Sequence, residues 1–167
     1  MTSPAMPAPN EVTVREFKPG DAAWFRRLNE EWIRRYFVME AEDEELLADP
    51  ESKILGCGGK IFFAIREGQP VGCCALIPLG AGEFEIAKMA VTESVRRAGI
   101  GRKLLLAAID AARASGGTRV WLETNHVMTP AIRLYESVGF RPVAREQLRT
   151  SLFARSDVQM ELALSNQ

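Results

Sequence analysis

A glycine-rich turn at Val91–Arg102 has the residue types of an anion-binding site. An apolar run ends at Val91, and Gly99 and Gly101 stand where a helical pattern begins. The first N–H groups of a helix lack partners within it, and the helix dipole adds positive charge there. Glycine also lets a phosphate approach the backbone closely. Four basic residues surround the turn, namely Arg96, Arg97, Arg102 and Lys103. The segment therefore predicts a pyrophosphate site.

The spacing of this turn excludes two common phosphate-binding motifs. A Walker loop requires Lys-Ser or Lys-Thr after its second glycine, whereas Arg102 and Lys103 follow Gly101. The dinucleotide fingerprint requires a third glycine, and Leu104 stands there. Spacing alone leaves open a tight packing turn that binds no ligand.

Two blocks of this sequence resemble a known family. The segment Arg96-x-x-Gly99-x-Gly101 resembles the coenzyme A signature, Gln/Arg-x-x-Gly-x-Gly/Ala, of the GCN5-related N-acetyltransferase (GNAT) superfamily. Downstream, Leu122–Asn125 and Ala131–Phe140 resemble the second half of the family pattern. The resemblance implies an α/β (α+β) fold with a mixed, mostly antiparallel central sheet flanked by helices. It also implies a splayed, bulged strand at the coenzyme site.

The resemblance implies that the chain moves an acetyl group from acetyl-CoA to a primary amine by direct attack in a ternary complex, without a metal. Main-chain groups of Met89, Ala90 and Val91 are expected to bind the pantetheine arm. Asn125 is expected to contact the coenzyme from the far side of the splay, unless it is a simple turn residue. The pyrophosphate is expected at Arg96, Arg97, Ala98, Gly99, Ile100, Gly101 and Arg102.

Two side chains are candidates for proton transfer. Tyr135 resembles the family's frequent general acid, and the alternative is an ordinary core tyrosine. Glu85 resembles the glutamate base of the histone-acetylating branch, and the alternatives are ordered water or a solvated Glu85 paired with Lys88. Glu83 is a weaker substitute. His126, just beyond a strand end, is a further candidate for relaying protons.

The acceptor amine stays open between a small molecule, an amino acid and a peptide. Trp32, Tyr36 and Phe37 are candidates for lining its pocket, with Arg34 or Arg35 holding a carboxylate. The interpretation we favour places Trp32 and Tyr36 in the core and leaves both arginines solvated. The acidic residues at 40–45 are interpreted as a solvated helix start.

Composition narrows the class of protein. The chain has 167 residues, 47% hydrophobic and 26% charged, with a formal net charge of -1. This balance argues against nucleic acid or a membrane as the partner. We predict a disordered leader at 1–10, a single domain at 11–165 and a cytoplasmic location; a homodimer stays open. The three cysteines show neither disulfide nor zinc spacing, and we interpret them as small buried hydrophobes.

The elements that must position these residues follow from periodicity. Helices are predicted after the N-cap Asp21, at Asp43–Leu47, at Gly99–Ser115, and from Pro130, capped by Thr129, to Gly139. Strands are predicted at Val12–Phe17, Lys60–Ile65, Val71–Ile77, Phe84–Val91, Arg119–Thr124, Arg141–Glu146 and Val158–Leu162.

Two other classes of function fit the same pattern. One is a non-catalytic acyl-CoA-binding or regulatory module on the same fold, because a fold does not determine a function. The other is a structural α/β domain that binds no nucleotide. Binding of acetyl-CoA would exclude the structural domain. Turnover of acetyl-CoA would exclude the non-catalytic module.

Overall fold

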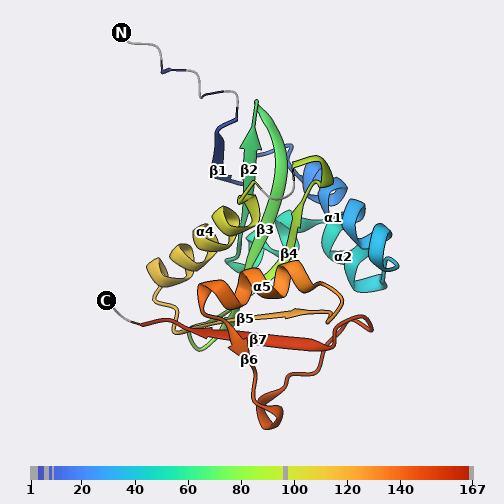
Figure 1. Ribbon diagram of the computed structural model, residues 1–167, viewed down its shortest axis with the longest axis vertical. Coiled ribbons are helices and arrows are strands. Elements are labelled where there is room, and N and C mark those ends of the chain that lie inside the picture. The colour runs from blue at the N-terminus through green and yellow to red at the C-terminus, as the bar shows by residue number, and fades with distance from the viewer. Residues whose placement is uncertain (1–3, 6–7, 9, 96–97, 166–167) are drawn as a thin grey trace.

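The computed structural model describes residues 4–5, 8, 10–95 and 98–165, which build one mixed sheet flanked by helices (Figure 1). The strand order is β1-β2-β3-β4-β5-β7-β6. Only β4 and β5 run parallel, and every other neighbouring pair is antiparallel. The strands are β1 (Val12–Glu16), β2 (Lys60–Arg66), β3 (Gln69–Gly80), β4 (Glu83–Val91), β5 (Arg119–Thr124), β6 (Arg141–Pro142) and β7 (Val158–Ala163). The predicted fold class is confirmed.

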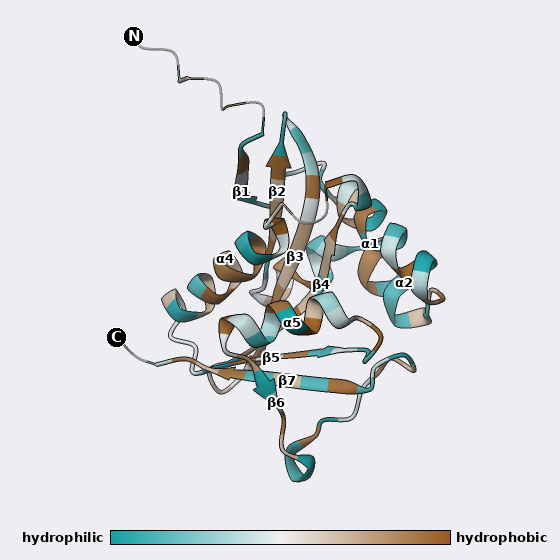
Figure 2. Cartoon of the chain, in the orientation of Figure 1, coloured by the Kyte–Doolittle hydropathy of each residue, from teal (hydrophilic) through white to brown (hydrophobic). Residues whose placement is uncertain are grey.

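Helices cover both faces of the sheet. They are α1 (Ala22–Tyr36), α2 (Ala41–Ala48), α3 (Pro50–Lys53), α4 (Ile100–Ala114) and α5 (Thr129–Val138). In α1 and α2 the hydrophobic residues face the sheet (Figure 2). None of the described helices is long and apolar enough to cross a membrane.

Alternation along β2 creates two apolar cores. Phe62 and Ala64 point to the face covered by α4 and α5, whereas Ile61 and Phe63 point to the face covered by α1 and α2. Successive side chains of a strand leave opposite faces, so a near-continuous apolar run is what a strand buried on both sides requires. Ile86 and Ala90 belong to these two cores, so β4 lies between the helical layers.

The sheet opens where β4 passes β5. The two strands pair from Glu83 to Glu85 on β4, and no described strand pairs with the rest of β4 on that side. Between Ala87 and Ala90, β4 carries two residues where β3 carries one, which is a β-bulge. Lys88 lies in the bulge with a φ of 51°, a conformation that costs a non-glycine residue free energy. The predicted splay and bulge are both present.

Several local predictions were wrong. Asp21 is the N-cap residue of α1, but its carboxylate accepts hydrogen bonds from Arg15 and the N–H of Lys18 instead of from the first turn of the helix. Helix α5 begins at Thr129, after Met128 as its cap. Strand β6 covers only Arg141–Pro142 instead of running to Glu146, and a long connection leads from it to β7.

Candidate active site

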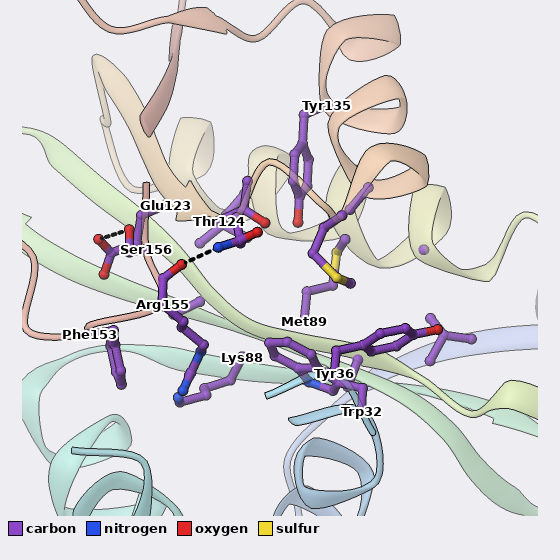
Figure 3. A pocket seen from close by; sticks show the side chains of 18 of the residues that line it. Trp32, Tyr36, Lys88, Met89, Glu123, Thr124, Tyr135, Phe153, Arg155 and Ser156 are labelled. Carbon is purple, nitrogen blue, oxygen red and sulfur yellow. Dashed lines mark hydrogen bonds between the residues drawn. The ribbon is translucent and has the colours of Figure 1, made fainter. Parts of the chain in front are cut away.

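A cavity of about 1130 Å³ occupies the opening between β4 and β5. Ligand pockets commonly enclose ~300–1,000 Å³, so this one has room for a large ligand and a second, small one. Its walls come from α1, α2, the start of α4, α5 and the connection before β7 (Figure 3). Two parts can be distinguished, one beside the glycine-rich turn and one beside α1 and α2.

The first part is formed by the end of β4 and the start of α4. Gly99 precedes α4 with a φ of 74°, which glycine adopts without strain. Gly101 packs closely, because a Cβ there would lie 3.2 Å from Leu134. Of the predicted coenzyme-binding residues, these line the cavity: Met89, Ala90, Val91, Gly99, Ile100, Gly101, Arg102 and Asn125. Ala98 does not line it, and Arg96 and Arg97 lie outside the described residues.

Tyr135 reaches the cavity from α5. Its ring is buried and packs against Phe140 at 5.9 Å between centroids, while its hydroxyl points into the cavity (Figure 3). No described residue is a hydrogen-bond partner of that hydroxyl. Burial raises the pKa of Tyr135 above its ordinary value, so the phenol stays protonated at neutral pH. The ring is therefore a core residue, and its hydroxyl still faces the cavity.

Glu85 lies on β4 at the last pair before the splay. Burial is the main cause that raises the pKa of Glu85 to about 7, and the charge of Glu123 on β5 adds to it. Lys88 and Arg149 oppose this shift without cancelling it. The alternative of a solvated glutamate paired with Lys88 was wrong, because Glu85 is partly buried and Lys88 binds Asp43. A carboxyl group of this kind can take a proton near neutral pH.

The other proton-transfer candidates are engaged elsewhere. Glu83 forms ion pairs with Arg149 and Arg119. His126 is not among the lining residues and pairs with Asp157 at the surface. Of these three sequence-derived candidates, Glu85 is the one that lines the cavity.

Asn125 shapes the loop after β5. Its Nδ2 donates to the carbonyl oxygen of Arg155 at 2.6 Å, and its Oδ1 accepts from the N–H of Val127 at 2.9 Å. The residue lines the cavity, but both ends of its amide are used inside the protein. This geometry favours the turn-residue alternative for the side chain.

A buried ion network joins three elements at the second part of the cavity. The Asp43 carboxylate of α2 is fully buried and accepts two hydrogen bonds of 2.6 Å from Arg155. It also binds the ammonium of Lys88 in the β4 bulge. Burial alone would raise the pKa of Asp43, but the hydrogen bonds from Arg155 and Lys88 lower it to about 2. The interpretation of Asp43 as part of a solvated helix start was therefore wrong.

Aromatic rings surround this network. The guanidinium carbon of Arg155 lies 4.7 Å from the ring centre of Phe153, and Lys88 Nζ lies 4.5 Å from the same ring. Figure 3 shows Lys88, Phe153, Arg155 and Trp32 together on this side of the cavity. Such contacts stabilise cations that are withdrawn from water.

The interpretation we favoured for the end of α1 was wrong for Tyr36 and agrees with the positions of the arginines. Trp32, Tyr36 and Phe37 line the cavity, and Tyr36 is exposed rather than in the core. Arg34 and Arg35 do not line it, and they pair with Glu30 and Glu93. Arg34 and Arg35 are 60% and 54% exposed, which agrees with the interpretation of both as solvated.

Two buried residues support the bulge and were missed from the sequence. Asn29 of α1 donates to Cys73 Sγ at 3.4 Å, and that thiol lies 3.5 Å from the carbonyl oxygen of Lys88. Burial raises the pKa of Cys73 to about 12, so it stays a thiol. Cys73 and Cys74 are buried as interpreted, whereas Cys57 is exposed. An asparagine on the apolar face of α1 was the available signal.

Comparison with known proteins agrees with this geometry. Residues 22–140 match the model of the acetyltransferase (GNAT) family. The chain is 28% identical to an uncharacterised N-acetyltransferase, YjgM of Escherichia coli, over 84% of its own length and 86% of that protein.

Solved structures share the fold. An acetyltransferase of Staphylococcus aureus Mu50 superposes with a TM-score of 0.84 at 22% identity, covering 93% of this chain and 100% of that one. The structure of yncA from Salmonella typhimurium, solved with its cofactor acetyl-CoA, gives 0.73 at 22% identity, covering 93% and 95%.

Proposed function

Because the chain belongs to the acetyltransferase (GNAT) family, we propose that it transfers the acetyl group of acetyl-CoA to a primary amine. The observation that carries this proposal is the placement of Glu85 and Tyr135 around one cavity at the splay of β4 and β5. A proton acceptor and a proton donor that both face one cavity are what acyl transfer to an amine requires.

The coenzyme is proposed to lie in the first part of the cavity. Its pantetheine arm would pair with the free edge of β4 at Met89, Ala90 and Val91, as a strand would. Its pyrophosphate would lie at the N-terminus of α4, where unpaired N–H groups and the helix dipole favour an anion. The absence of a Cβ at Gly99 lets that group approach.

The reaction then follows from the positions of the two side chains. Glu85 removes a proton from the ammonium, and the nitrogen lone pair attacks the thioester carbon. An N–H of the bulge near Ala90 would stabilise the oxyanion. The C–S bond breaks as the carbonyl reforms, and Tyr135 supplies the proton that the departing thiolate takes. The nitrogen of the intermediate gives up its second proton, which passes through water in the cavity to the Tyr135 phenolate, so the product is a neutral amide and Tyr135 is protonated again.

The experiment that tests this function has two measurements on the same samples. Thermal unfolding with and without acetyl-CoA reports binding, and we expect Tm to rise with acetyl-CoA concentration. Thiol release is then followed against a panel of amines, amino acids, polyamines and peptides. Release that depends on an acceptor supports the transferase. Binding without release for any acceptor would instead favour a coenzyme-binding module, and no binding would refute both.

A further inference from the structure

The cations that line the second part of the cavity are already paired. Lys53 binds Glu45 at 2.9 Å, and Lys88 and Arg155 share the buried Asp43. Arg155 also binds Glu40 at 3.1 Å. The side chains of Lys88 and Arg155 are only 5% and 13% exposed. A ligand carboxylate would have to compete with these internal partners for every described cation in this part.

Two carboxylates from neighbouring parallel strands face the same space. Glu85 stands on β4 and Glu123 on β5, and the charge of Glu123 is strong enough at Glu85 to shift its titration. Ser156 donates to Glu123 at 2.7 Å and fixes its position (Figure 3). The unbalanced charge of this part of the cavity is therefore negative, and it suits an ammonium group.

Exposed apolar side chains form the remaining wall. Leu152 is 73% exposed and Tyr36 is 42% exposed, and both line the cavity beside Trp32 and Ile77. Large apolar groups that stay in contact with water at a cavity wall are available to pack against a ligand.

Resting on the proposed acetyl transfer, we propose that the acceptor is a primary amine with an apolar body and no carboxylate beside the amine. Asp43 is the specificity-determining residue. Together with Glu40, it balances the charges of Arg155 and Lys88, which would otherwise attract an amino acid's carboxylate. The ammonium would lie between Glu85 and Glu123, and the apolar body against Leu152, Tyr36 and Trp32. Asp43 itself touches no substrate in this arrangement, so it acts by positioning and balancing the two cations that it binds, Arg155 and Lys88.

The first test uses three compounds that differ at one group. 2-Phenylethylamine has the amine and the apolar body, phenylalanine amide adds a neutral group, and phenylalanine adds a charged carboxylate of similar size. Binding of each to the protein saturated with coenzyme A is measured by calorimetry, and kcat/KM is measured with acetyl-CoA. Because a carboxylate beside Glu85 and Glu123 is repelled, we expect phenylalanine to be weaker than both others by about 100-fold.

The second test removes the proposed cause. Asp43→Asn leaves Arg155 and Lys88 without their shared charge, so the preference for amine over amino acid should fall at least about tenfold. Arg155→Met added to Asp43→Asn should restore part of that preference. Glu16→Gln is the matched control, because its partner Lys60 is 43% exposed and neither residue lines the cavity, so the preference should not change.

Each outcome decides between the alternatives. Phenylalanine that binds as well as 2-phenylethylamine to the wild-type protein overturns the proposal, and so does failure of all three compounds to bind. The wild-type comparison stands even where Asp43→Asn fails to fold. Calorimetry detects binding without turnover, so the two proposals can fail separately. If the protein binds acetyl-CoA and these amines in the expected order but transfers no acetyl group, the proposed transferase activity is wrong and the proposed class of ligand is still supported.

Discussion

Replacing Glu85 by glutamine removes the titrating group at the centre of the proposed mechanism. Glu85 is partly buried beside Glu123, and its pKa is raised from the ordinary 4.5 to about 7. A raised carboxyl pKa means that the folded protein disfavours the charged form. The variant should therefore change two quantities, the pH dependence of stability and the pH dependence of the rate.

The effect on stability has a definite sign. The contribution of Glu85 to folding is fully present below pH 4.5 and is lost as the pH rises through about 7, because the folded state holds the proton more tightly than the unfolded state. A tenfold change in proton affinity is worth about 1.4 kcal/mol, which sets a ceiling of about 3 kcal/mol. Allowing for partial exposure, we expect Glu85→Gln to gain about 1–3 kcal/mol relative to wild type between pH 4.5 and 8.

The effect on rate runs in the opposite direction. For the wild type, kcat/KM should fall about tenfold per pH unit below a midpoint near 7. Glu85→Gln should lower the rate at pH 8 by about 10²–10⁴-fold and abolish that limb. The assay needs two acceptors whose amines have different pKa values. If the midpoint of the acidic limb reports ionisation of the acceptor, it will differ between the two acceptors, whereas a midpoint that reports Glu85 will be the same for both.

Two further variants make the assay specific. Glu123→Gln removes a neighbouring negative charge, so the midpoint should move below 7 while the limb persists. Glu146→Gln changes an exposed carboxylate away from the cavity and should leave both profiles unchanged. The reasoning is refuted if Glu85→Gln keeps the wild-type limb, or if its stability difference from wild type does not vary with pH.

Two other predictions concern the acid and the glycine-rich turn. Tyr135→Phe removes only the hydroxyl that faces the cavity, so kcat should fall by about 10²-fold or more while the dissociation constant of acetyl-CoA stays within about twofold; full activity would exclude Tyr135 as the acid. Gly99→Ala puts a side chain at a φ of 74° where it meets no neighbour, so it should lower stability by about 1–2 kcal/mol through backbone strain and weaken acetyl-CoA binding. Gly101→Ala, at an ordinary helical φ, should cost less in a denaturant titration, and equal losses would contradict the strain argument.

The fold and the glycine-rich turn could be predicted because their signals are local. The apolar run of β2 and the helical period of α4 indicate buried elements without knowledge of their partners. Gly99 is needed where the chain must adopt a positive φ before a helix, and that requirement is visible within a few residues. The bulge was expected from the family resemblance alone, because the sequence around Lys88 has no glycine or asparagine that would indicate a positive φ.

The acceptor half could not be predicted, because its determinants are far apart in the chain. Asp43 reads as one acidic residue among several at a helix start, and only folding places it against Lys88 and Arg155. Counting charges along the sequence misses such pairs, because the sequence does not distinguish a buried aspartate from an exposed one. The same holds for Tyr36, whose helical spacing indicates a core position although it faces the cavity.

This difference follows from what each half must recognise. A coenzyme shared by a family can be bound by main-chain groups, so its site needs glycines and a helix start at fixed spacing, and little else. An acceptor that differs between relatives must be recognised by side-chain charge and shape. In this chain, Asp43 and Glu40 balance the charges of Arg155 and Lys88. The carboxyl groups of Glu85 and Glu123 form no ion pair within the part of the chain that the structure describes, and we propose that they set the charge where the acceptor amine binds. A search for the acceptor should therefore begin with amines chosen by charge, and vary the apolar body second.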